Sequence, residues 1–156
     1  MSTVISIGNQ DFESIRKSKS FYIDKTAFIK EWWENNDSVT LITRPRRFGK
    51  TLNLSTLHCF FSVKYKGRSD LFENLSIWKE KKYRDLQGTY PVIFLSFASV
   101  KGITYESARE SILLLLEELY QQHSFLLEKG ILNPKETEYF QKVGTEMSDA
   151  EAAMAI

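Results

Sequence analysis

The 156-residue sequence predicts an α/β fold in which a mostly parallel β-sheet lies between two layers of helices. Residues 39–43 and 91–97 are apolar runs of strand length, and residues 52–61 and 104–129 repeat apolar side chains at helical spacing. A continuously apolar strand is typical of a parallel sheet with helices on both faces. Two strands alone make a poor core, so this fold requires further strands.

Two helices are expected before the first strand. Asp11 is a good N-cap for a helix over residues 12–17, and Asp24 for a second helix over residues 25–35. The apolar face of the second helix consists of Phe28, Ile29, Trp32 and Trp33. The paired tryptophans could form a stacking platform for bases, but their spacing from Phe28 favours a place in the core.

Residues 44–51 follow the first strand and read Arg-Pro-Arg-Arg-Phe-Gly-Lys-Thr. A strand, a tight loop, Gly-Lys-Thr and then a helix is the layout of a phosphate-binding P-loop, the Walker A motif. That motif usually begins with glycine, and Arg44 occupies the position here. The alternative interpretation is that Gly49 only permits a tight turn from strand to helix.

The residue types of this loop suit phosphate and Mg²⁺. The first turn of a helix presents unpaired N–H groups and the positive end of the helix dipole. Glycine lets the backbone approach an oxygen without a clashing Cβ. We therefore expect Lys50 to reach the β- and γ-phosphates of ATP and Thr51 to be a Mg²⁺ ligand. The expected nucleotide-binding residues are Arg47, Phe48, Gly49, Lys50 and Thr51.

Basic residues gather around this loop. Between Ser38 and Ser69 there are seven basic residues and no acidic one, although the whole chain has a net charge of only +1. The basic residues are Arg44, Arg46, Arg47, Lys50, Lys64, Lys66 and Arg68. Such an island concentrates polyphosphate or nucleic-acid backbone, so a non-enzymatic domain that binds nucleic-acid phosphate is the alternative function. A solvated basic face without a ligand is the plainer alternative.

The region after the P-loop helix predicts short elements and a second strand. We expect a surface turn at residues 64–68, a short element at 71–75 capped by Asp70 and Glu73, and a helix over 76–86 that buries Trp78. The strand at 91–97 ends in Ser96-Phe97-Ala98-Ser99 and carries no acidic residue. P-loop hydrolases need an acid after a second strand to hold Mg²⁺ and position water, so we expect no turnover by these residues alone.

Three helix starts follow. Thr104 is expected to cap a long helix that ends at Gly130, Asn133 with Pro134 and Glu136 to start a helix that ends near Gly144, and Ser148 to start a third. The apolar stripe of the long helix consists of Ala108, Ile112, Leu115, Leu116, Leu119, Leu126 and Leu127. It could bind a partner, but packing on the sheet is the better interpretation. With so few strands, residues 1–156 are expected to be the N-terminal part of a larger domain.

Composition limits the class of protein. Charged residues make up 26% and hydrophobic residues 42%, as in a globular domain. The longest apolar run, Ile112 to Leu116, is too short to cross a membrane, and no secretory signal is visible. Cys59 is the sole cysteine, which excludes an internal disulfide and fits a cytoplasmic location; core packing explains it better than a zinc site with His58.

The sequence resembles the predicted AAA-ATPase-like proteins of bacteria and archaea. The shared segments are Ile7-Gly8, Asp11-Phe12, Ile15-Arg16, residues 22–26 (Tyr-Ile-Asp-Lys-Thr), residues 41–55 around the P-loop, Pro91-Val92-Ile93 and Leu95-Ser96-Phe97. In that family arginine normally replaces the first glycine, so Arg44 is a family trait.

The resemblance implies an AAA-like fold and ATP binding, with phosphate and Mg²⁺ roles for Lys50 and Thr51. Family members usually continue into a strand that ends in Asp-Glu, and often into a PD-(D/E)XK nuclease-like domain; this sequence ends before both. By position in such folds, Phe21 or Tyr22 would lie near the adenine, although both rings could equally be core residues.

Overall fold

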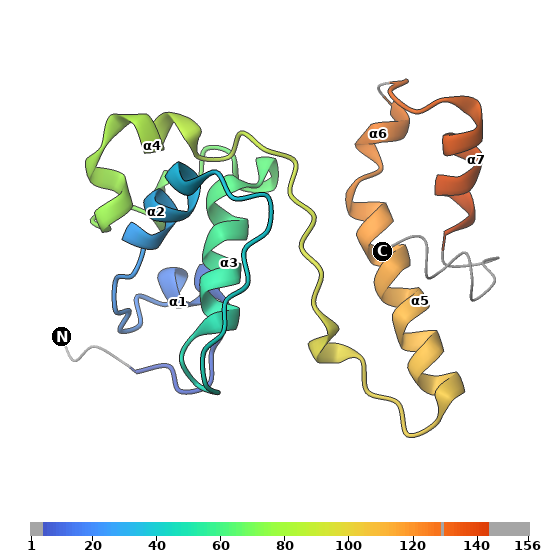
Figure 1. Ribbon diagram of the computed structural model, residues 1–156, viewed down its shortest axis with the longest axis horizontal. Coiled ribbons are helices and arrows are strands. Elements are labelled where there is room, and N and C mark those ends of the chain that lie inside the picture. Colours follow the sequence, from blue (N-terminus) through green and yellow to red (C-terminus); the bar gives the residue numbers. More distant parts are fainter. Residues whose placement is uncertain (1–4, 129, 144–156) are drawn as a thin grey trace. The chain divides into compact units, whose positions relative to one another are not determined.

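A computed structural model describes residues 5–128 and 130–143 of the chain, which divides into two compact units, Met1–Val92 and Ile93–Ile156. Each unit is described by itself. The first contains the helices α1 to α4, and the second contains α5 to α7 (Figure 1). None of the helices in the described ranges is both long and apolar enough to cross a membrane.

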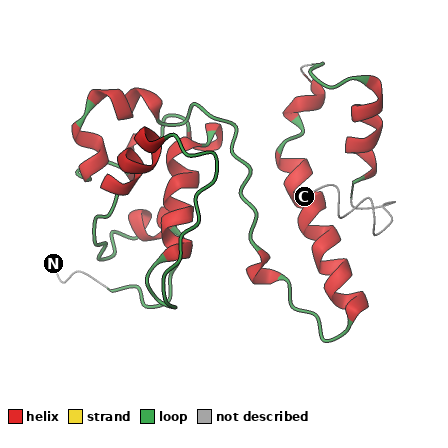
Figure 2. Cartoon of the chain, viewed as in Figure 1, coloured by secondary structure: helices red, strands yellow, loops and turns green. Residues whose placement is uncertain are grey.

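The predicted mostly parallel sheet is wrong for the residues that the structure describes. In residues 5–128 and 130–143 every regular element is a helix, and Figure 2 shows the two predicted strands as loops. The one trace of strand pairing among them is an isolated parallel bridge between Ser62 and Tyr90.

The two apolar runs are unpaired in the structure, which explains the error. Apolar β-branched residues favour an extended backbone, but a strand forms only when a neighbour accepts its hydrogen bonds. Residues 39–43 and 91–96 have no ladder, and several of their apolar side chains are exposed: 84% for Val39, 83% for Leu41 and 71% for Ile93. The predicted strands at residues 39–43 and 91–97 are therefore wrong.

The first unit is a set of short helices around one buried helix. Its α-helices are α1 (Phe12–Lys17), α2 (Ala27–Asn35), α3 (Lys50–Phe61) and α4 (Lys81–Leu86), and its 3-10 helices are η1 (Val63–Tyr65), η2 (Ser69–Leu71) and η3 (Ser76–Lys79). Asp11 caps α1 as predicted, because its carboxylate accepts the N–H of Ser14. The predicted single helix over residues 76–86 is instead η3 followed by α4.

The core of this unit is mainly aromatic and lies around α3. Its buried residues are Phe12, Ile29, Cys59, Phe60, Phe61, Tyr65, Leu71, Phe72, Leu75, Ile77 and Tyr83. Trp32 and Trp33 are half-buried against it, with their rings 5.4 Å from that of Phe61, which confirms their place in the core. Trp78 is half-buried as well, rather than fully buried as predicted.

Polar contacts fix α1 and its cap to the rest of the unit. The hydroxyl of Ser55 on α3 accepts the N–H of Phe12 at 3.0 Å and donates to Asp11 at 3.2 Å. Arg16 donates to the carbonyl oxygens of Leu71 and Glu73 at 2.7 and 2.9 Å. These long-range bonds hold α1 against the middle of α3 and against η2 and the residues that follow it.

The second unit consists of α5 (Tyr105–Gln122), α6 (Phe125–Glu128) and α7 (Pro134–Lys142), with the 3-10 helix η4 (Phe97–Ser99) before them. Thr104 and Asn133 form capping boxes on α5 and α7, as predicted. Leu116 is buried with Val143, and Ile112 is half-buried beside them, so these two residues of the predicted stripe pack next to the end of α7. The predicted packing of the stripe on a sheet is wrong, because no sheet is present in the described residues. The expected helix start at Ser148 lies outside the described residues.

Two helix boundaries differ from expectation. The long helix ends at Gln122 instead of Lys129, and a turn at His123 separates it from α6; the His123 ring nitrogen Nδ1 lies 2.8 Å from the Leu119 oxygen. Helix α2 begins at Ala27 after Thr26, and not directly after Asp24. Asp24 does not cap it: one carboxylate oxygen accepts the N–H of Thr26, the residue before the helix, and the other accepts the N–H of Ser76.

Candidate functional site

The predicted phosphate loop leads directly into α3. Gly49 is the residue before the helix and has φ +78°, a left-handed conformation that glycine adopts without strain. The first helical hydrogen bond runs from the N–H of Asn53 to the oxygen of Gly49 at 2.9 Å. The N–H groups of Lys50, Thr51 and Leu52 precede it and have no acceptor within the helix.

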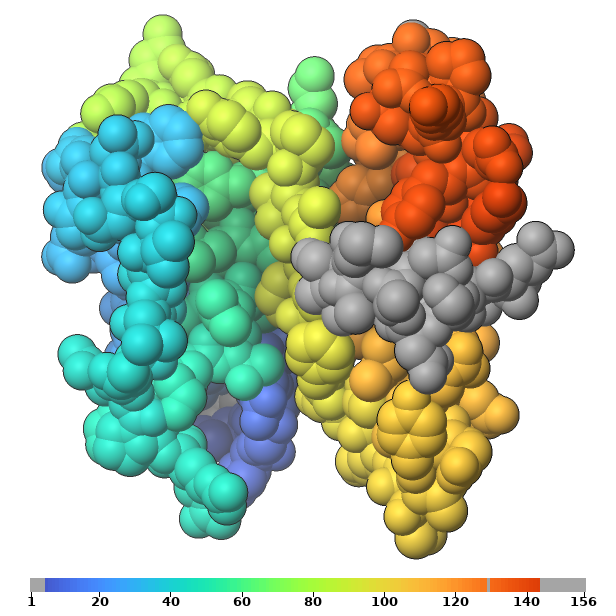
Figure 3. Space-filling model, turned by 45° about the vertical axis from the view of Figure 1, so that its right-hand side comes forward, coloured from blue at the N-terminus to red at the C-terminus, as the bar shows by residue number. Residues whose placement is uncertain are grey.

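This helix start carries neither a side-chain cap nor an acidic residue in its first turn. By contrast, Asp11, Thr104 and Asn133 supply side-chain caps to α1, α5 and α7. The loop before it is exposed from Thr43 to Phe48, at the surface of the first unit in the teal part of Figure 3. The positive end of the α3 dipole is thus open to an anion from solution.

Lys50 reaches back over the loop. Its ammonium group donates to the carbonyl oxygens of Arg44 and Pro45, the latter at 3.3 Å. These are neutral acceptors on the same loop, so an anionic oxygen would be a stronger partner for the ammonium than either carbonyl. Thr51 is exposed on the first turn of α3.

A pocket of about 350 Å³ opens beside this helix start. Its walls come from the N-terminal segment, the segment after α1, the loop and the first turns of α3. The lining residues are Ser6, Asn9, Ile15, Phe21, Tyr22, Ile23, Lys25, Arg47, Phe48, Gly49, Leu52 and Asn53.

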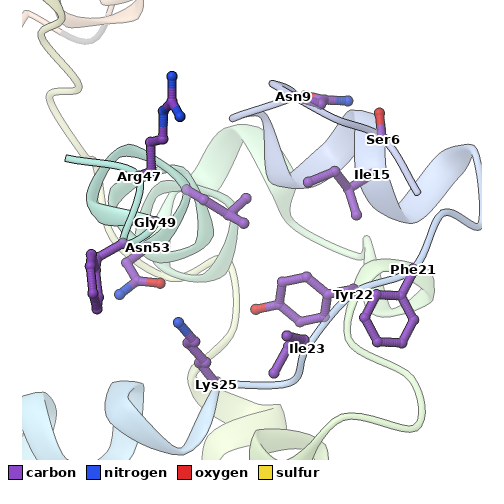
Figure 4. A pocket seen from close by; sticks show the side chains of 12 residues that line it. Ser6, Asn9, Ile15, Phe21, Tyr22, Ile23, Lys25, Arg47, Gly49 and Asn53 are labelled. Atoms are coloured by element: carbon purple, nitrogen blue, oxygen red, sulfur yellow. The ribbon is translucent and has the colours of Figure 1, made fainter.

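We call the end of the pocket next to Gly49, where Lys25 and Asn53 lie, its polar end (Figure 4). We call the opposite end its apolar end, because it holds Ile15, Tyr22, Ile23 and Phe21, although Ser6 and Asn9 also lie beside Ile15. The lining contains two cationic side chains and no carboxylate. Burial raises the pKa of Tyr22, so its hydroxyl stays protonated and uncharged at neutral pH.

The structure brings together only part of the predicted site. Arg47, Phe48 and Gly49 line the pocket, together with Phe21 and Tyr22 from a distant part of the sequence. Lys50 and Thr51 adjoin it through the backbone of α3, but their side chains do not line it. The residue types along the loop could not reveal that Lys25, from the segment before α2, and Asn53, on α3, also line the pocket.

The other candidate features are structural. Cys59 is buried, and burial raises the pKa of its thiol to about 12, which fits core packing. Across the described residues, no three His, Cys, Asp or Glu side chains are grouped so that they could hold a metal ion. Arg68 is paired with Glu13 and Asp70 at 2.9 and 2.8 Å, so its charge is largely neutralised within the basic island.

A family model described as "Predicted AAA-ATPase" matches residues 6–154, nearly the whole chain. The chain belongs to this family. The match includes the loop, α3 and every segment that lines the pocket. It supports an AAA-ATPase-like character for the region in which the loop and pocket lie.

One relative is an uncharacterized protein from the vnfD 5′ region of Azotobacter chroococcum mcd 1. It is 36% identical over 94 residues, which cover 60% of this chain and 17% of the relative. The chain therefore spans about a sixth of that protein's length in the matched region. No solved structure matches the chain.

Proposed function

We propose that this AAA-ATPase family member binds ATP at residues 44–51 and in the adjoining pocket. The observation that carries the proposal is the position of the pocket, which opens at the uncapped start of α3 beside Gly49. Family membership supports the same ligand. A helix start with free N–H groups suits the phosphates, and an apolar pocket beside it suits a base.

The phosphates are assigned to the loop side. The N–H groups of Lys50 and Thr51 would donate to phosphate oxygens, while Gly49 leaves room for the backbone to approach. Lys50 would exchange the carbonyl oxygens of Arg44 and Pro45 for β- and γ-phosphate oxygens. That exchange replaces neutral acceptors with charged ones and is therefore favourable.

The base is assigned to the apolar end. Phe21 and Tyr22 offer aromatic faces there, and Ile15 and Ile23 complete the apolar wall. At about 350 Å³ the pocket lies near the lower end of the range for small-molecule sites, roughly 300–1,000 Å³. It can enclose a base and ribose while the phosphates extend along the loop.

Mg²⁺ is assigned to the Thr51 hydroxyl, phosphate oxygens and water. Hard cations take oxygen ligands, and Mg²⁺ often keeps several waters and relies on substrate phosphates. No acidic residue is available from the segment at 91–97, so nothing there both holds the metal and orients a water molecule. We propose that the chain binds Mg-ATP weakly and does not hydrolyse it by itself.

The test is titration of the purified chain and its Lys50→Ala variant with ATP, with and without Mg²⁺, alongside an assay of phosphate release. Removal of a charge-assisted contact worth roughly 1.5–3 kcal/mol should weaken ATP binding about tenfold to a hundredfold. Lys64→Ala is the matched control, because Lys64 lies on η1 and does not line the pocket. We expect this control to bind ATP like the wild type, and no variant to release phosphate.

Equal ATP affinity of the wild type and Lys50→Ala would refute the proposal. A parallel titration with single-stranded DNA tests the alternative of a nucleic-acid face. There the loss would be spread over Arg44, Arg46 and Lys64, with a strong dependence on salt. Lys50-dependent phosphate release by this chain would contradict the expected lack of turnover.

A further inference from the structure

We infer that Lys25 is a second cation of the nucleotide site, one that contacts phosphate and makes affinity rise with the number of phosphates on the ligand. The inference rests on the proposed function and deepens it. Lys25 lies outside the loop, 24 residues before Gly49 in the sequence, and reaches the site only through the fold.

The position of Lys25 is the first observation. It lines the polar end of the pocket, and in Figure 4 its ammonium group points toward Asn53 on the first turns of α3. Lys25 is an exposed residue, so a ligand in solution can reach its ammonium group. Arg47, the other cation of the lining, points away from the remaining labelled side chains in the same view.

The surroundings of Lys25 leave its charge available. The carboxylate next to it in sequence, Asp24, is fully engaged by other groups. One oxygen accepts from the N–H and hydroxyl of Thr26 at 2.9 and 2.7 Å, and the other accepts from the N–H and hydroxyl of Ser76 at 2.7 and 2.6 Å. Within the part of the chain that the structure describes, no ion pair involves Lys25.

The same four bonds hold Lys25 in place. Thr26 is fully buried, and its hydroxyl accepts the N–H of Ile77 at 3.2 Å. Asp24 and Thr26, the two neighbours of Lys25 in the sequence, are therefore both hydrogen-bonded to residues of η3. We call the set formed by Asp24, Thr26 and Ser76 the Asp24 latch. The latch fixes the backbone of Lys25 at the rim of the pocket, which reduces the entropy that a long side chain loses when it binds.

The charge of the ligand distinguishes two possible roles for the Lys25 side chain. If Lys25 only covers the apolar wall with its methylene stem, it contributes equally to every ligand that has an adenosine group. If its ammonium contacts phosphate, its contribution grows with the charge beside α3 and vanishes for adenosine. The carboxylate-free lining of the pocket favours the second role.

The experiment measures the affinities of adenosine, AMP, ADP and ATP for the wild-type chain and for Lys25→Gln, by competition against a fluorescent ATP analogue. We expect Lys25→Gln to weaken ATP and ADP about tenfold, AMP less, and adenosine not at all. Lys79→Gln is the matched control, an exposed lysine of the same unit that does not line the pocket. Lys25→Arg should restore most of the dependence on phosphate number.

Two outcomes overturn the inference. An equal loss for all four ligands assigns Lys25 to the base end, and unchanged affinities remove it from the site.

Lys50→Ala separates these failures from failure of the proposed function. If ATP binding depends on Lys50 but not on Lys25, only this inference falls. If the wild type shows no Lys50-dependent binding, both fall. Thermal melting of each variant, expected to match the wild type, shows that the fold is intact.

Discussion

The two units bury very different cores. In the first, eleven side chains form a continuous buried cluster with several aromatic pairs around α3. In the second, the buried cluster of the described residues contains Leu116 and Val143, with Ile112, Leu113, Tyr120 and Tyr139 half-buried beside it. The first unit is held by contacts between residues far apart in sequence, and the second mainly by helix caps and one helix pair.

This difference indicates which unit can hold a binding site in place. The pocket needs segments from residues 6–25 and 47–53 to stay within contact of each other, and only a packed core holds such segments in place. Helices that rely on caps and few buried contacts open locally at low free energy. We therefore expect the first unit to protect its backbone amides from exchange far better than the second. The predictions below test that contrast.

The largest effect is expected for Phe60→Ala. Phe60 is fully buried, and its ring packs against those of Phe61 and Phe72 at 5.0 and 5.2 Å. Loss of a buried phenylalanine costs about 3–5 kcal/mol of unfolding free energy. Urea unfolding measures the change, and Phe97→Ala, whose side chain is half-exposed, is the control with little effect. A cost below about 1 kcal/mol would show that the aromatic cluster is not a packed core.

A smaller loss is expected for Leu116→Ala in the second unit. The site has few buried neighbours and can collapse around the cavity, so the cost should fall at the low end of the range for leucine, about 2 kcal/mol. Backbone amides should exchange faster in α5 and α7, and their exchange rates in α3 should stay unchanged. Leu114→Ala on the exposed face of α5 is the control. Equal losses of protection in α3 would end the distinction between the units.

The Asp24 latch predicts a pH-dependent contribution to stability. Partial burial raises the pKa of Asp24, but hydrogen bonds from Ser76 and Thr26 outweigh it and lower the pKa from 3.8 to about 2. Because the folded pKa is the lower one, the stabilisation is present above about pH 4 and is lost as the pH falls toward 2.

Asp24→Ala should therefore be less stable than the wild type by about 1–2 kcal/mol at pH 7, since two N–H donors lose their acceptor. The difference should shrink as the pH falls from 4 to 2. Urea midpoints of both proteins at several pH values measure it. A difference that stays constant over that range would mean that the carboxylate charge plays no part in the latch.

The smallest effect is expected at the cap of α5. Thr104→Ala removes the hydroxyl that accepts the N–H of Ser107 at 3.2 Å, at a cost of about 1 kcal/mol. Because α5 has few buried contacts, amide exchange in its first turn should accelerate most. Thr104→Ser keeps the acceptor and serves as the control. If alanine and serine behave alike, the cap does not hold the start of this helix.

Local signals in the sequence predicted local structure well. Asp11, Thr104 and Asn133 cap the helices that they were expected to cap, because a cap depends on a donor only three residues away. The same reasoning failed at Asp24, whose carboxylate binds Ser76, 52 residues further along the chain. No pattern near residue 24 contains that information.

The sheet and the pocket show the same limit. Apolar runs at residues 39–43 and 91–97 indicated an extended backbone, but pairing depends on neighbours that a run of residues does not specify. Gly49 and its loop were found from their spacing, whereas Lys25 and Asn53 line the same pocket only because the fold brings their two segments together. Lys25 does belong to one segment that the sequence shares with the family, Tyr-Ile-Asp-Lys-Thr at residues 22–26.

The central claim, that the first unit binds nucleotide phosphate at the start of α3, is tested most directly by amide NMR of the chain titrated with Mg-ATP. The account predicts the largest shifts at the amides of Gly49, Lys50 and Thr51, smaller shifts at Tyr22 and Lys25, and unchanged amides in α5 and α7. Shifts centred on Lys64 and Lys66, or on the second unit, with Gly49 and Lys50 unaffected, would contradict it.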